Sequence, residues 1–143
     1  MPITKLDHYY VRSSDLERSR NFYCEALGFE VMPRPAFPSP GYWLGVNGSV
    51  QVHMGEDGVA EHEGKEFHGS PASGGAIDHI AFQGTDPEAM AQHLAAQGLS
   101  PRTRYLAAAQ LLQIFVADPD GVVIELNFPG VSKAPSWADQ QSI

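Results

Sequence analysis

The first half of the chain changes from a two-residue period to a helical one. Ile3–Val11 reads as a strand whose residues divide between two faces, with Leu6, His8 and Tyr10 on one and Asp7, Tyr9 and Val11 on the other. A Ser-x-x-Glu capping box at Ser14 and Glu17 then predicts a helix that continues to about Leu27 and is ended by Gly28. Three strands are predicted next, with an Asn-Gly hairpin signal between the last two, at residues 29–32, 42–46 and 50–54.

The second half repeats this order. Residues 77–82 resemble residues 6–11, and both segments begin with an apolar residue followed by Asp and His. Asp86 and Pro87 predict the start of a second helix, and Gly98 predicts its end. Strands are predicted after it, from about residue 102, at 111–116 and, following an Asp-Pro-Asp-Gly turn, at 122–128. Two βαβββ units are the simplest account of this duplication.

The predicted fold class is therefore α+β, with two βαβββ modules that together make one domain. The first module covers residues 1–54 and the second covers residues 77–128. Between them, residues 55–76 are rich in Gly, acidic and small residues and are interpreted as a linker loop. Residues 129–143 form a polar tail with Trp137, which we expect to be loose or to dock on a partner chain.

Charge and composition exclude several classes of partner. The 143 residues include 17 acidic and 9 basic ones, which gives a formal charge of −8. No Lys/Arg cluster is present, so neither a nucleic-acid binder nor a protein of anionic membrane surfaces is expected. There is no apolar run of about 18 residues and no secretory start. Cys24 is the single cysteine, which rules out an intramolecular disulfide and favours a cytoplasmic location.

Four polar residues occupy matched positions in the two modules. His8 and His79 lie in the first strand of each module, and His53 and Glu125 lie in the last. Their neighbours in the strands are apolar, so the four side chains are expected on the opposite, concave face of the sheets. A carboxylate in such a strand costs several kcal/mol unless it is paired or metal-bound. Imidazoles and a carboxylate suit one divalent ion, namely Fe, Mn, Ni, Co or Zn.

Each of these residues also has a structural interpretation. A lone strand histidine is usually a hydrogen-bonded core or surface residue, and the matched positions of His8 and His79 favour ligands instead. Glu125 could be a solvent-facing strand residue, and His53 is either a fourth ligand or part of the site wall. Cys24 is interpreted as a packed residue rather than a nucleophile. The remaining histidines, His62, His68 and His93, are interpreted as solvated. Of these, His68 could enter the site if its loop closes.

Several segments give the chain a family resemblance. They are Leu6–His8, the helix end SRNFYCEALGF at residues 19–29, Ile77–Phe82, and QIFVADPDG at residues 113–121, which leads to Glu125. Over about residues 3–128 the chain resembles the vicinal oxygen chelate superfamily, which holds glyoxalases, bleomycin-resistance proteins and extradiol dioxygenases. The resemblance implies a half-open barrel around one metal, with His8, His79 and Glu125 as ligands. It also implies a homodimer.

Three functions compatible with this resemblance differ in their chemistry. The first is a glyoxalase-like lyase or isomerase that acts on a small substrate with vicinal oxygens through a metal-stabilised enediolate. Glyoxalase I proteins place a Glu where this chain has His53, which weakens a strict lactoylglutathione lyase assignment. The second is an Fe(II)-dependent ring-cleaving dioxygenase, against which the short chain counts. The third is a non-catalytic protein that binds an antibiotic or another small molecule, against which the retained ligands count.

The residues expected around the substrate come from several strands. His53 and Tyr10 are the candidates for catalysis, because both are predicted on the metal face. Structural packing is an equally good explanation for the candidate substrate-binding residues, which are Trp43, Arg104, Gln113 and Phe115. Arg102 and Arg104 could meet an anionic substrate, although surface arginines are the default interpretation.

Overall fold

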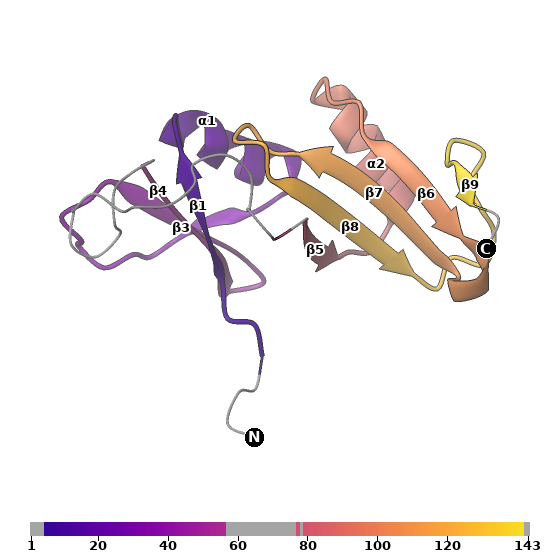
Figure 1. Cartoon of the computed structure of the whole chain (residues 1–143), viewed down its shortest axis with the longest axis horizontal. Coiled ribbons are helices and arrows are strands. Elements are labelled where there is room, and N and C mark those ends of the chain that lie inside the picture. The colour runs from indigo at the N-terminus through magenta and orange to yellow at the C-terminus, as the bar shows by residue number, and fades with distance from the viewer. Residues whose placement is uncertain (1–4, 57–76, 78, 142–143) are drawn as a thin grey trace. The chain divides into compact units, whose positions relative to one another are not determined.

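The strands and helices divide between two structural units, Met1–Ala72 and Ser73–Ile143 (Figure 1). The computed structural model describes residues 5–56, 77 and 79–141. Each unit has the element order strand, helix and three strands, so the expected α+β fold built from two βαβββ modules is confirmed. No helix within these described ranges has the length and apolar character needed to cross a membrane.

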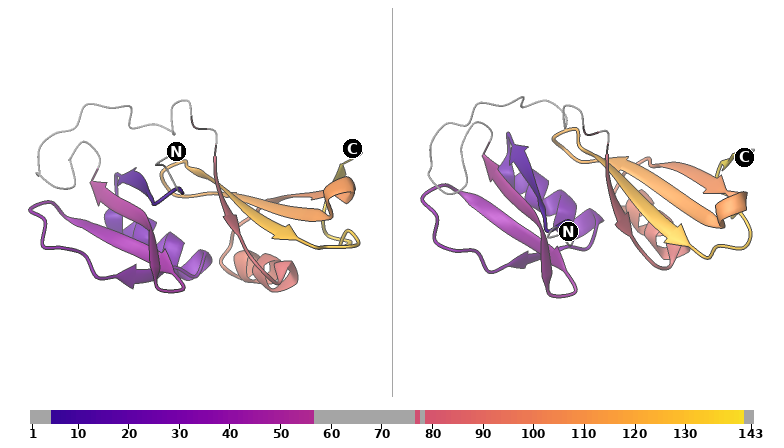
Figure 2. Two further views of the ribbon diagram at one scale, coloured as in Figure 1. Left: turned by 90° about the horizontal axis from the view of Figure 1, so that it is seen from below. Right: turned by 60° about the horizontal axis from the view of Figure 1, so that its bottom comes forward.

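The first unit forms a four-stranded open sheet with its helical segment on one side (Figure 2). The strand order is β1-β4-β3-β2, in which β1 runs parallel to β4 and the other pairs are antiparallel. Its elements are β1 (Tyr9–Ser13), α1 (Leu16–Asn21), the π-helical η1 (Phe22–Ala26), β2 (Glu30–Met32), β3 (Gly41–Val46) and β4 (Ser49–Glu56).

The second unit repeats this topology and adds one short strand at the edge. Its sheet order is β5-β8-β7-β6-β9, with β5 parallel to β8 as β1 is to β4. Its elements are β5 (Ile80–Gln83), α2 (Pro87–Ala96), β6 (Arg102–Leu106), the 3₁₀ turn η2 (Ala107–Ala109), β7 (Leu111–Ala117), β8 (Val123–Pro129) and β9 (Gln140–Gln141).

In each unit one face of the sheet supplies the core. Alternate residues of a strand point to opposite faces, so every second side chain can turn toward the helix. In the first unit, Val52 and Met54 of β4 are fully buried, as is Tyr23 of η1. In the second unit the fully buried hydrophobic side chains among the described residues are Leu94, Leu112, Ile114, Ile124 and Phe128. The intervening positions carry the polar side chains of the candidate site.

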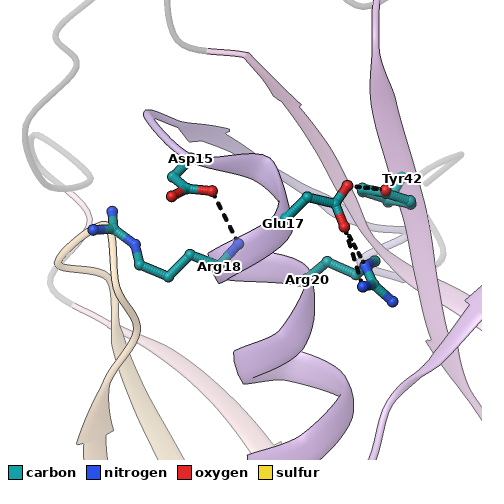
Figure 3. A network of polar contacts seen from close by, with 5 residues as sticks. All are labelled: Asp15, Glu17, Arg18, Arg20 and Tyr42. Atoms are coloured by element: carbon teal, nitrogen blue, oxygen red, sulfur yellow. Dashed lines mark hydrogen bonds and ion pairs between the residues drawn. The ribbon is translucent and has the colours of Figure 1, made fainter.

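The first helix is capped by Asp15, not by the predicted Ser14 and Glu17 box. The backbone at Asp15 is extended, and its carboxylate accepts a hydrogen bond from the amide of Arg18 at 3.1 Å (Figure 3). With Asp15 at the cap, Glu17 is the second helical residue, one position short of the place from which a capping-box Glu reaches back. Glu17 instead pairs with Arg20 at 3.1 Å and accepts a hydrogen bond from the hydroxyl of Tyr42.

The remaining helix and turn signals are confirmed, with one change in helix type. Beyond Asn21 the predicted single helix continues as a π-helical segment, in which the amide of Leu27 donates to the carbonyl of Phe22. Gly28 ends it with φ +79°, a conformation that costs glycine little. Both residues of the Asn47-Gly48 hairpin have positive φ, as a type I′ turn requires.

The described part of the tail is not loose, because it contacts its own unit; its docking on a partner chain stays a prediction. The Tyr105 hydroxyl donates to the carbonyl of Val131 at 2.6 Å, and the Trp137 indole N–H donates to Glu88 at 2.5 Å. Strand β9 then pairs in parallel with β6. The predicted linker begins differently as well, because β4 continues to Glu56; the rest of that loop, with His62 and His68, lies outside the described residues.

The contact between Glu17 and Tyr42 predicts a measurable titration. Hydrogen bonding to Glu17 raises the pKa of Tyr42 above its ordinary range, because the neutral hydroxyl is the donor. A raised folded-state pKa means that the contact stabilises the fold below the ordinary tyrosine pKa and is lost as the pH rises through the raised value. The absorbance difference at 295 nm between the wild type and Tyr42→Phe isolates one of the 5 tyrosines. We expect its midpoint to fall in a Glu17→Gln background, and an unchanged midpoint would contradict the contact.

Candidate functional site

In the first unit, His53 is held between two other aromatic rings. Its ring stacks on that of His8 with centroids 3.6 Å apart and on that of Trp43 with centroids 4.2 Å apart, both nearly parallel. The register explains this arrangement, because β4 pairs His53 with Tyr10 of β1 and with Trp43 of β3. His53 is only 7% exposed. Its plane is therefore set by the stack, and the predicted residues His8, Tyr10, Trp43 and His53 share one face of the sheet.

His8 lies one residue before β1 and two before Tyr10, so it belongs to the same face. Its Nδ1 is 2.6 Å from a carboxylate oxygen of Asp7, and this hydrogen bond lowers the pKa of Asp7. A carboxylate bonded to Nδ1 fixes the ring orientation and leaves Nε2 for a ligand role, which is the usual outer-shell arrangement of metal-binding histidines. The donor chemistry of His8 therefore fits a divalent ion.

Tyr10 points along the sheet toward a glycine. A Cβ at Gly55 would lie 1.8 Å from the Tyr10 hydroxyl oxygen, so only glycine leaves room for this phenol. Gly55 therefore shapes this face, and it was not among the predicted site residues. The signal was available, since a glycine inside a strand pattern often marks a close approach of other atoms.

In the second unit, a buried carboxylate meets a histidine. Glu125 is 6% exposed, and one of its oxygens lies 2.9 Å from Nε2 of His79. The register pairs Glu125 with Ala81, which places His79, two residues before Ala81, on the same face. His79 directly precedes β5, as His8 directly precedes β1. The structure thus brings together one predicted pair of ligands in each unit.

Gln113 completes the surroundings of Glu125. Its amide nitrogen donates to the second Glu125 oxygen at 2.7 Å and to the side-chain oxygen of Asn127 at 2.9 Å. Its amide oxygen accepts from Nε of Arg104 at 2.7 Å. The amide orientation follows from its neighbours, because a carboxylate can only accept and a guanidinium can only donate. Asn127 was not predicted, although its position two residues after Glu125 places it on the same face.

Two arginines and an aromatic ring extend this face across β6 and β7. The guanidinium carbons of Arg102 and Arg104 lie 5.3 and 5.4 Å from the centroid of the Phe115 ring. The register aligns Arg102 with Phe115 and Glu125 in one row, and Arg104 with Gln113 and Asn127 in the next. All three predicted substrate-binding residues of this unit, Arg104, Gln113 and Phe115, therefore lie on the face that carries Glu125.

The donor set consists of nitrogen and oxygen atoms. Imidazole and carboxylate ligands suit first-row divalent metals, and the only cysteine is elsewhere. Within the described parts of the chain, no group of three or more His, Cys, Asp or Glu side chains is assembled as a metal site. Burial raises the pKa of the Cys24 thiol, which suits the packed role predicted for it. His93 is exposed on α2, as expected of a solvated residue.

Comparison with known proteins gives a consistent result. The sequence model of the family described as Glyoxalase/Bleomycin resistance protein/Dioxygenase superfamily matches residues 5–126. Glyoxylase I 4 of Arabidopsis thaliana is 28% identical over 131 residues, which cover 87% of this chain and 70% of the plant protein.

Solved structures show the same fold. A glyoxalase family protein of Bacillus anthracis superposes with a TM-score of 0.67 at 26% identity, over 89% of this chain and 96% of its own. A lactoylglutathione lyase of Agrobacterium tumefaciens also has a TM-score of 0.67, at 15% identity, over 89% of this chain and 95% of its own. At that identity the second likeness concerns the fold alone.

The role of Gln113 can be tested through stability. Gln113→Leu keeps the side-chain volume and removes the hydrogen bonds to Glu125, Asn127 and Arg104. We expect the free energy of unfolding in urea to fall by about 1–3 kcal/mol, because buried polar partners are left unsatisfied. The matched control is Gln92→Leu, at an exposed position of α2 whose amide contacts Glu88, where we expect a change within about 0.5 kcal/mol. Equal midpoints for the two variants would contradict a structural role for the network.

Proposed function

The chain belongs to the Glyoxalase/Bleomycin resistance protein/Dioxygenase superfamily, and from this premise we propose that it is a metal-dependent enzyme of the glyoxalase-like kind. It acts as a lyase or isomerase on a small substrate with vicinal oxygens. The observation that carries the proposal is the buried Glu125 beside His79, at positions matched in the other module by His53 and His8.

We assign one divalent ion to His8, His79 and Glu125. The support is the duplicated positions of these residues, the Asp7 carboxylate on Nδ1 of His8, and the proximity of Nε2 of His79 to Glu125. His53 is the fourth candidate, as a ligand or as part of the site wall. The ligands come from one chain or from two copies of it, and members of the superfamily commonly form dimers.

When bound, the ion would act as a Lewis acid toward two adjacent oxygens of the substrate. The chain's own residues would move the proton. His53 is the proposed base for a proton alpha to a carbonyl, since imidazole is the side chain best suited to proton transfer near neutral pH. The stack with His8 and Trp43 limits rotation of its ring. Tyr10 supplies a hydroxyl on the same face, and Trp43 provides an apolar wall.

The second candidate is a ring-cleaving dioxygenase that uses Fe(II). Two histidines and one carboxylate are the ligand set of the facial triad in non-haem iron oxygenases, and His8, His79 and Glu125 match it in residue type. A binding protein without catalysis is the third candidate, because the superfamily also includes bleomycin-resistance proteins. Fold likeness alone does not choose among these functions.

Metal analysis tests the site. We expect about one ion per chain after anaerobic loading with Fe(II), Ni(II), Co(II), Mn(II) or Zn(II), since three N/O ligands are the usual number at an open catalytic site. The His8→Ala/Glu125→Ala variant should lose it. The control His93→Ala removes an exposed histidine from α2 and should keep it. A wild type that binds no stoichiometric metal would overturn both enzyme candidates and leave the binding protein.

Isotope exchange tests the reaction and the base. In deuterated buffer, the metal-loaded protein should exchange the proton alpha to the carbonyl of small hydroxycarbonyl compounds, as followed by NMR. Loss of a general base typically costs about 10²–10⁴-fold in rate, and we expect a loss of that order in His53→Ala with the metal retained. If His53→Ala also loses the metal, His53 is a ligand. Oxygen uptake with a catechol and Fe(II), without exchange, would favour the dioxygenase.

A further inference from the structure

The two arginines of β6 stand out in a strongly acidic chain. The sequence has 17 acidic residues against 9 basic ones. On α1, the guanidinium of Arg20 forms an ion pair with Glu17 at 3.1 Å. Arg102 and Arg104 form no ion pair with any carboxylate among the described residues, and they contact the ring of Phe115 and, for Arg104, the amide of Gln113. Two adjacent cations on one face of the sheet therefore lack an anionic partner in the described chain.

Gln113 lies between Arg104 and Glu125 and is hydrogen-bonded to both. Its amide oxygen accepts a hydrogen bond from Nε of Arg104, and its amide nitrogen donates one to Glu125. The side chain of Gln113 thus forms an amide bridge between the guanidinium and the carboxylate. It leaves the two terminal nitrogens of the Arg104 guanidinium for another acceptor. It also leaves Glu125 to His79 and to the proposed metal.

The aligned rows set the distance between the cations and the carboxylate. Arg102 and Glu125 lie in one row of the sheet and are separated by Phe115 of β7. Two strand spacings correspond to about 10 Å between the backbones of β6 and β8. Arginine side chains extend into this space, so an anionic group a few bonds from a chelated pair of oxygens would reach them. Phe115, beneath both guanidinium groups, holds them in place through cation–π contacts.

We propose that Arg102 and Arg104 bind an oxyanion of the substrate, so that the preferred substrates are small anions with vicinal oxygens, as carboxylates or phosphate esters. The proposal rests on the proposed function for the position of the chelated oxygens. Its basis is chemical: the planar guanidinium matches carboxylate and phosphate oxygens in a two-point hydrogen-bonded geometry. Arg104 makes the principal contact, because Gln113 fixes its orientation.

Calorimetric titration of the metal-loaded protein tests this with three probes that share vicinal oxygens. Glycerol is neutral, glycerate carries a carboxylate and glycerol 3-phosphate carries a phosphate. We expect the wild type to bind at least one anionic probe about 10-fold or more tightly than glycerol. The probe that binds more tightly shows whether the preferred oxyanion is a carboxylate or a phosphate. Arg104→Gln should lose about 10- to 100-fold in that affinity, since a hydrogen bond to a charged group contributes on that scale. Arg18→Gln is the control, as it removes the same charge from an exposed position on α1.

The outcomes separate this inference from the proposed function. Unchanged affinity in Arg104→Gln, equal losses in Arg18→Gln, or no preference for anions in the wild type would each overturn it. Arg102 is exposed, so Arg102→Gln provides a second variant if Arg104→Gln does not fold. It should also lower the affinity for the anionic probe. If the wild type binds no metal, the proposed function fails, and titration of the metal-free protein with inorganic phosphate tests the arginines alone. Phosphate binding that weakens in Arg104→Gln would then support the anion site, and its absence would overturn it.

Discussion

The buried carboxylate of Glu125 is the constraint on which the polar face of the second unit depends. A carboxylate that is 6% exposed must be compensated by hydrogen bonds or charge, because desolvation alone would cost several kcal/mol. His79 and Gln113 supply that compensation on its two oxygens. Gln113 can do so only with its amide oxygen turned toward Arg104, so one buried charge links the orientations of Gln113 on β7, Arg104 on β6 and His79, which directly precedes β5.

In the first unit, the buried polar side chain is held by aromatic rings rather than by charged and hydrogen-bonding partners. His53 lies at the position equivalent to Glu125, and it is buried by stacking between His8 and Trp43. The same topology thus holds a stack of aromatic rings in one unit and a hydrogen-bonded carboxylate in the other. In both units the last strand of the module, β4 or β8, pairs in parallel with the first strand, β1 or β5. Parallel pairing extends the register to the residue before the first strand, so His8 lies beside Gln51 and His79 beside Val123, each two positions before His53 or Glu125. That is where each unit has its histidine and its buried partner.

The two faces of each sheet have different roles. The apolar face packs on the helix and supplies the stability, with Val52, Met54, Ile114 and Ile124 fully buried. The polar face carries the side chains of the candidate site, among them the buried and hydrogen-bonded Gln113 and Glu125. Gly55 also belongs to the polar face, because its missing side chain leaves room for the Tyr10 hydroxyl and it does not form a turn.

The sequence by itself determined the two βαβββ modules, the end of the first helix at Gly28 and the start of the second at Asp86. It also determined the strand faces on which His8, His53, His79 and Glu125 lie. These follow from local periodicity and from duplication, which are written in the order of residues. The choice of Asp15 over Ser14 as helix cap is local, because the cap bond joins Asp15 to Arg18 three residues on. Tertiary structure alone decided that the tail adds a strand beside β6 and that Gln113 bridges Arg104 and Glu125. The physical reason is that each depends on which acceptor or strand edge lies within hydrogen-bond distance, and residues far apart in the chain meet only after the register is established.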